Sequence, residues 1–98
     1  MKITADVHLV GGPSVSDPSD AAIYLVKGRD AAALIDAGTG DGHSRVLKNI
    51  AEAGVRPGDI THIFLTHCHY DHSGGALLLR SATAARTVAH ELDAEYIE

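Results

Sequence analysis

Hydrophobic and polar positions along this chain fall into short apolar runs separated by turns and by one clear helical stretch. Residues 3–10 alternate between apolar and polar side chains, a period of two that predicts a half-exposed strand. Residues 11–20 are rich in Gly, Pro, Ser and Asp and predict a loop. Residues 21–26 (AAIYLV) and 31–36 (AAALID) are continuous apolar runs around a polar turn. They predict an antiparallel hairpin that is covered on both faces.

Residues 43–53 predict an amphipathic helix, after which Gly54 suits the left-handed position past a helix end. One face of this helix gathers apolar side chains at helical spacing: Val46, Leu47, Ile50 and Ala51. Residues 60–66 predict the next strand, so the stretch 31–66 forms a β-α-β unit with a right-handed crossover.

The last third of the chain continues the same alternation of strand and helix. Residues 76–85 predict a helix, residues 86–89 a short strand and residues 90–98 the start of another helix. The sequence then ends without a cap or a Gly or Pro stop signal, so we expect it to be cut short.

Composition and charge narrow the class of protein. The chain has 98 residues, 45% hydrophobic and 21% charged, which is enough for one small globular domain over residues 1–98. A formal charge of −5 with scattered basic residues argues against nucleic-acid binding. No apolar run approaches the roughly 18 residues of a membrane span. With no signal peptide at the start and a single cysteine, a cytoplasmic location is expected.

Four metal-ligand side chains lie within six residues directly after the 60–66 strand: His67, His69, Asp71 and His72. Imidazole and carboxylate suit zinc and other first-row metals. In an extended segment His67 and His69 point to the same side and can bind one ion. Asp71 and His72 are adjacent and diverge, and a turn there would direct them at a second ion. The competing interpretation is a His-rich loop that binds metal only adventitiously.

Asp36 ends an apolar strand and is followed by a glycine-rich turn. Two compatible roles follow: Asp36 accepts backbone N–H groups of the turn, or it orients a metal ligand. The spacing of Gly38, Gly40 and Gly42 matches neither a dinucleotide fingerprint nor a phosphate loop, so we assign these glycines to turn chemistry.

Three further side chains near the motif carry weaker signals. His62 lies within a predicted strand and is interpreted as a packed or solvent-edge histidine. Cys68 should point away from the side that His67 and His69 share, and we assign it to packing. Tyr70 either faces a substrate or covers the loop, and the sequence does not choose between these positions.

Residues 66–75 (THCHYDHSGG) resemble the signature of the metallo-β-lactamase-fold superfamily. Residues 22–38 resemble that family's first motif, with Asp36 as its structural acid, and residues 56–66 and 88–94 resemble the segments around the signature. The resemblance implies an α/β (α+β) fold: the N-terminal half of an αββα sandwich, a mixed β-sheet with helices on one face.

The resemblance also implies roles for the motif. His67 and His69 would bind a first metal, Asp71 and His72 a second, and Asp71 would orient the attacking water. Two zinc ions are expected in the complete protein, with iron or manganese as alternatives. The family's later ligands, a third histidine, a bridging aspartate and a final histidine, have no counterpart here, since His90 lies where the family does not usually place a ligand.

The implied function is a hydrolase that uses a metal-bound hydroxide on an ester, thioester, lactone or related bond of a small molecule. The 98-residue chain alone would be inactive or weak. The runner-up is an iron-dependent oxidoreductase on the same fold, of the sulfur dioxygenase or flavodiiron type. A nuclease is disfavoured by the negative charge. The third alternative is a non-catalytic half-domain that exposes a sheet face and associates as a homo-oligomer.

Overall fold

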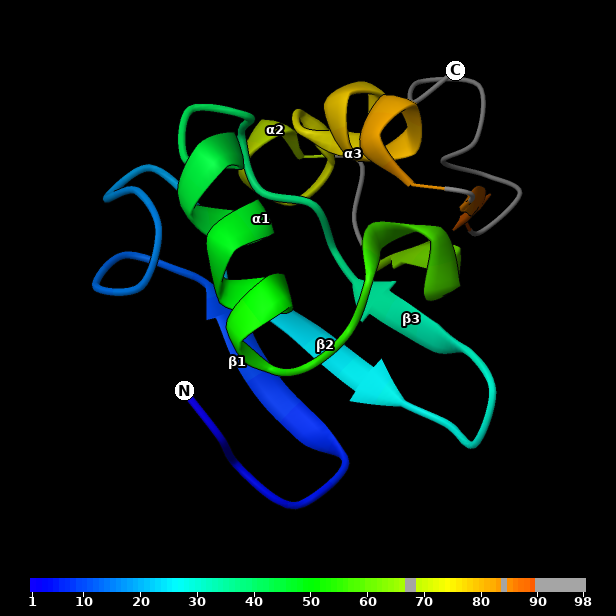
Figure 1. Cartoon of the computed structure of the whole chain (residues 1–98). Coiled ribbons are helices and arrows are strands. Elements are labelled where there is room, and N and C mark those ends of the chain that lie inside the picture. Colours follow the sequence, from blue (N-terminus) through cyan, green and yellow to red (C-terminus); the bar gives the residue numbers. More distant parts are fainter. Residues whose placement is uncertain (67–68, 84, 90–98) are drawn as a thin grey trace.

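A single mixed β-sheet organises the computed structural model, which describes residues 1–66, 69–83 and 85–89 (Figure 1). The strands lie in the order β1-β2-β3-β4-β5. The first three pair antiparallel, whereas β3, β4 and β5 pair parallel. Their bounds are β1 Val7–Gly11, β2 Ile23–Lys27, β3 Ala32–Ile35, β4 Ile60–Leu65 and β5 Arg86–Ala89. The helices are α1 His43–Glu52, the 3₁₀ turn η1 Pro57–Asp59, α2 Tyr70–Ser73 and α3 Ala76–Ala82.

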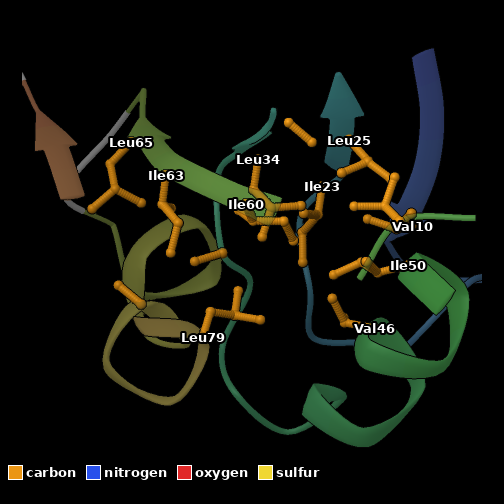
Figure 2. Close-up of a cluster of buried hydrophobic side chains, with 14 residues drawn as sticks. Val10, Ile23, Leu25, Leu34, Val46, Ile50, Ile60, Ile63, Leu65 and Leu79 are labelled. Atoms are coloured by element: carbon orange, nitrogen blue, oxygen red, sulfur yellow. The ribbon is translucent and has the colours of Figure 1, made fainter. Parts of the chain in front are cut away.

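One face of the sheet carries the hydrophobic core. Alternate strand residues point to this face, where they meet apolar side chains of α1 and α3 (Figure 2). Ile50 of α1 and Leu79 of α3 are almost completely buried there, at 0% and 1% exposure. The fully buried strand residues are Ile23, Leu25, Leu34, Ile60 and Ile63. The expected α+β fold, a mixed sheet with helices on one face, is confirmed.

The opposite face of the sheet is open in the part of the chain that the structure describes. The strand register places Tyr24 beside Ile35, Ile35 beside Phe64, and Phe64 beside Val88. Tyr24, Phe64 and Val88 are 38%, 40% and 41% exposed. The prediction that both faces of the hairpin are covered is therefore wrong for the described residues. A continuous apolar run shows that both faces of a strand can be buried, but the described helices cover only one face of this sheet.

The first strand begins later than its alternating pattern predicts. Thr4 forms a tight turn in which its Oγ1 accepts the backbone N–H groups of Asp6 and Val7 at 3.2 and 3.1 Å. This turn folds the chain back on itself, and Lys2 forms an isolated antiparallel bridge with His8. Residues 3–6 alternate in sequence but lie outside the strand, because a local side-chain acceptor competes with sheet pairing.

The hairpin and the β-α-β unit are confirmed by the antiparallel β2–β3 and parallel β3–β4 pairings. The predicted helix appears as α1, and Gly54 after it has a φ of 83°. Ala51 is exposed, so its place on the buried face was predicted wrongly. None of the helices in the described ranges has the length and apolarity needed to cross a bilayer.

The C-terminal elements follow the prediction in part. The predicted 76–85 helix ends as α3 at Ala82, because Thr83 takes extended backbone angles of −128° and −178°. The short strand at residues 86–89 is confirmed as β5. The predicted helix at residues 90–98 lies outside the described residues.

Candidate metal centre

The predicted metal motif follows β4 in the chain. Because β3 and β4 are parallel, both strands end on this side of the sheet. His69 has extended backbone angles, φ −61° and ψ 142°, and precedes α2. Asp71 and His72 lie within α2, so the turn that the sequence predicts between them is a turn of helix. His67 and Cys68, a predicted ligand and a predicted packing position, lie outside the described residues.

Asp36 connects the end of β3 to this motif. Its carboxylate accepts the backbone N–H of Thr66 at 2.8 Å and the Thr66 hydroxyl at 2.8 Å. The Nδ1 atom of His72 lies 3.0 Å from the same carboxylate. Asp36 is only 5% exposed and has a φ of 69°, a conformation that Asp and Asn tolerate better than most residues. One carboxylate therefore orders both the backbone that enters the motif and a predicted metal ligand within it.

The contact with Asp36 sets which nitrogen of His72 faces the motif. A proton on Nδ1 donates to the carboxylate and leaves the lone pair of Nε2 for a metal ion, the tautomer usual for histidine ligands. Nε2 of His72 lies 3.9 Å from Oδ1 of Asp71. Imidazole nitrogen and carboxylate oxygen are donor types that first-row divalent metals accept, and these two atoms are close enough to face one shared ion.

His69 and His62 have different surroundings. His69 is exposed, and its carbonyl accepts the backbone N–H groups of His72 and Ser73 at 2.9 and 3.0 Å. Within residues 1–66, 69–83 and 85–89, no three His, Cys, Asp or Glu side chains gather in a metal-binding arrangement. His62 stacks on Phe64 on the open sheet face, with ring centroids 5.6 Å apart. His62 is therefore a packed side chain.

Two loops hold α2 by its backbone. The N–H of Ala21 donates to the carbonyl of Asp71 at 3.1 Å, and the N–H of Ala37 donates to the carbonyl of His72 at 2.7 Å. Just after α2, the N–H of Gly75 donates to the carbonyl of Gly38 at 2.8 Å. We call these three hydrogen bonds the α2 cradle. They fix the helix that carries two predicted ligands to the loops after β3 and before β2.

Asp20 is a buried carboxylate next to the α2 cradle that sequence reasoning missed, because it lies in a stretch whose composition indicates only a loop. It is 3% exposed and accepts both the N–H and the hydroxyl of Thr39 at 2.8 Å. A Cβ at Gly38 would lie 2.7 Å from one Asp20 oxygen, and a Cβ at Gly42 2.6 Å from the other. The glycine spacing that we assigned to turn chemistry therefore contained a signal: it leaves room for a carboxylate.

Tyr70 precedes the two predicted ligands of α2 and is 66% exposed. Its ring lies close to Gly74, where an added Cβ would come within 2.6 Å of a ring carbon. The side chain therefore lies along α2 while most of its surface faces solvent.

This fold and site define the class of protein: the chain belongs to the metallo-beta-lactamase superfamily, whose family profile matches residues 16–98. It is 35% identical over 96 residues to the "Probable metallo-hydrolase YqjP" of Bacillus subtilis. This match covers 96% of this chain and 29% of that protein. It is 36% identical over 93 residues to a hydroxyacylglutathione hydrolase of Rhodospirillum rubrum, covering 93% of this chain and 32% of the enzyme.

The solved structures give the same result. A HARLDQ-motif mutant of a metallo-beta-lactamase from Cronobacter sakazakii superposes with a TM-score of 0.85 at 30% identity. The match covers 97% of this chain and 35% of that one. The chain therefore spans about a third of the length of the relatives that it matches, and these relatives include metal-dependent hydrolases.

Proposed function

We propose that the protein is a metal-dependent hydrolase that uses zinc to cleave an ester, thioester, lactone or related bond of a small molecule. The observation that carries this proposal is the line of contacts from Asp36 through His72 to Asp71. A carboxylate on one imidazole nitrogen, with a second carboxylate beside the other nitrogen, is the arrangement that prepares a histidine to bind a metal. Membership of the superfamily supports the same chemistry.

Each residue of the site has a proposed task. Asp36 holds the ring of His72 in the tautomer that presents Nε2, while Asp71 supplies an oxygen ligand and orients the attacking water. His67 and His69 are the proposed ligands of the first ion, and Asp71 and His72 those of the second. When bound, zinc supplies Lewis acidity, which lowers the pKa of a water and polarises the bond under attack.

The relatives guide the choice of substrate. The Rhodospirillum rubrum relative is named a hydroxyacylglutathione hydrolase, which makes a hydroxyacylglutathione the first compound to test. An iron-dependent oxidoreductase on the same fold is the alternative, because the same ligand types bind iron.

Replacing Asp71 or His72 by alanine is expected to lower zinc affinity at least about 100-fold, because loss of even an outer partner of a ligand costs 10–100-fold. In a polypeptide as long as these relatives, hydrolysis of hydroxyacylglutathione should fall in parallel. His62→Ala is the matched control and should keep zinc affinity within about twofold, because His62 packs on Phe64. Zinc content by mass spectrometry and competition with a chelating dye measure the affinity. Bound iron together with oxygen consumption would refute the proposed hydrolase function.

We also propose that the 98-residue chain in isolation covers its open sheet face with a second copy of itself. Apolar side chains run across four adjacent strands on that face, and exposed apolar surface of this kind promotes association. Phe64 lies within the row and is 40% exposed.

Phe64→Lys should raise the dissociation constant of the dimer at least about tenfold, because it places a charge in an apolar interface. Leu77→Lys is the control: Leu77 is 72% exposed on α3, away from the sheet face. Light scattering over a concentration series measures the constant. A monodisperse monomer of the unsubstituted chain would contradict the proposal. A longer polypeptide that is monomeric would show that its own residues cover the face.

A further inference from the structure

We propose that Asp20 is a positioning residue for the metal centre and that it acts through the backbone of α2. The inference rests on the proposed function, since it takes Asp71 and His72 of α2 to be metal ligands. Asp20 itself contacts neither of them. Its role follows from the two loops that its carboxylate joins.

The carboxylate of Asp20 is buried and satisfied entirely by donors of the protein. Both donors of Thr39, the backbone N–H and the hydroxyl, lie 2.8 Å from Oδ1, and the hydroxyl of Ser16 donates to Oδ2. Burial of a charged group is costly unless it is hydrogen-bonded in this way. Gly38 and Gly42 leave the space that these short contacts require. The site is therefore shaped around a carboxylate.

Both loops that Asp20 joins also belong to the α2 cradle. Ala21, the next residue along the chain, donates to the carbonyl of Asp71. On the other side of the carboxylate, Thr39 follows Gly38, whose carbonyl accepts the N–H of Gly75. The contact from Asp20 to Thr39 thus closes a ring of loop, helix and loop around α2.

Two aspartates therefore hold the same helix in different ways. Asp36 reaches the side chain of His72, whereas Asp20 sets the spacing between the backbone segments that grip α2. If this spacing changes, the carbonyl groups of Asp71 and His72 shift relative to each other, and so do the ligand atoms that follow them. Small displacements of this kind weaken a metal site even when every ligand is present.

The first test measures hydrogen exchange of the cradle amides of Ala21, Ala37 and Gly75 in the full 98-residue chain. Asp20→Ala should reduce their protection at least about tenfold, because each contact to a charged acceptor contributes to local stability. Amides of β2 and β3 should change much less. A uniform loss of protection throughout the chain would overturn the proposal, since it would show a general stability role. Unchanged cradle amides would overturn it as well.

Asp17→Ala is the matched control in the same loop. Asp17 is half-buried, and the side-chain and backbone hydrogen bonds of Ser19 hold the pKa of its carboxyl below the usual value. Its carboxylate accepts the backbone N–H and the hydroxyl of Ser19 and makes none of the three cradle hydrogen bonds, although the Ser19 hydroxyl also lies 3.1 Å from that of Thr39. This variant should leave the protection of all three cradle amides within about twofold.

Asp20→Asn is the conservative rescue. Its Oδ1 can still accept from Thr39, and its amide nitrogen can donate to the hydroxyl of Ser16. It should restore most of the cradle protection, and it keeps the test decisive if Asp20→Ala does not fold. An asparagine variant with cradle amides as exposed as those of the alanine variant would contradict the hydrogen-bonding geometry.

A zinc titration separates this inference from the proposed function. The unsubstituted protein should bind zinc, Asp20→Ala about tenfold more weakly, and Asp20→Asn nearly as well as the parent. Failure of the parent to bind zinc would refute the proposed function, while hydrogen exchange would still decide whether Asp20 holds α2. Parent-like zinc affinity in a folded Asp20→Ala protein would refute the positioning role alone.

Discussion

Replacing Asp36 by alanine is expected to lower the free energy of unfolding by about 3 kcal/mol, because each of the part-buried hydrogen bonds that its carboxylate accepts contributes about 1 kcal/mol. The carboxylate accepts from the backbone N–H and hydroxyl of Thr66 and contacts Nδ1 of His72. An alanine held at the φ of 69° adds about 1 kcal/mol of backbone strain. Urea unfolding, followed by circular dichroism, measures the loss.

The same substitution should weaken zinc binding by about 10–100-fold, the usual effect of removing the partner of a ligand histidine. Asp36→Asn separates the two effects. Asparagine tolerates the left-handed backbone and keeps one acceptor oxygen. Asp36→Asn should therefore recover more than half of the unfolding free energy that Asp36→Ala loses. It cannot offer an oxygen to both Thr66 and His72, so zinc affinity should still fall. Zinc affinity within about twofold of the parent in both variants would contradict this role for Asp36.

The fold was largely predictable because its periodic segments are also its buried ones. Val46 and Ile50 recur at helical spacing, and both pack into the core from α1. The errors fall where tertiary contacts or local acceptors compete with the pattern. The hydroxyl of Thr4 accepts two backbone N–H groups, so β1 begins later than the pattern predicts. Apolar residues such as Tyr24 stay exposed on the open face.

The candidate site was predictable as far as its residues are contiguous. The spacing of residues 67–72 indicates a metal motif on its own, and Asp36 stands out as a carboxylate at a strand end. Asp20 could not be found in this way, because its partner Thr39 is 19 positions away and the contact exists only in the folded chain. Its trace in the sequence is indirect: glycines at positions 38 and 42 where a Cβ would collide with its oxygens.

Substitution of Gly75 is the second change expected to cause a large loss of stability, because there is no room for a side chain at this position. Its backbone angles, φ −86° and ψ 0°, suit any residue, so conformation does not require glycine here. An added Cβ would instead collide with the carbonyl oxygen of Ala37 and lie 3.1 Å from the backbone nitrogen of Gly40. Backbone atoms cannot rotate away as a side chain can. The chain must therefore move as a whole, and the hydrogen bond from Gly75 to Gly38 lies at the point of movement.

Gly75→Ala should lower the free energy of unfolding by about 3 kcal/mol, at the upper end of the usual cost of overpacking. Two other glycines serve as controls. Gly58 has nothing within 4 Å of an added Cβ, so Gly58→Ala should stay within about 0.5 kcal/mol of the parent. Gly54 also has open space but a φ of 83°, so Gly54→Ala should cost about 1–2 kcal/mol from strain alone. Urea unfolding of the three variants separates space from conformation. A Gly75→Ala protein more stable than Gly54→Ala would show that the loop after β3 gives way to α2, and the tight packing proposed for the cradle would then be wrong.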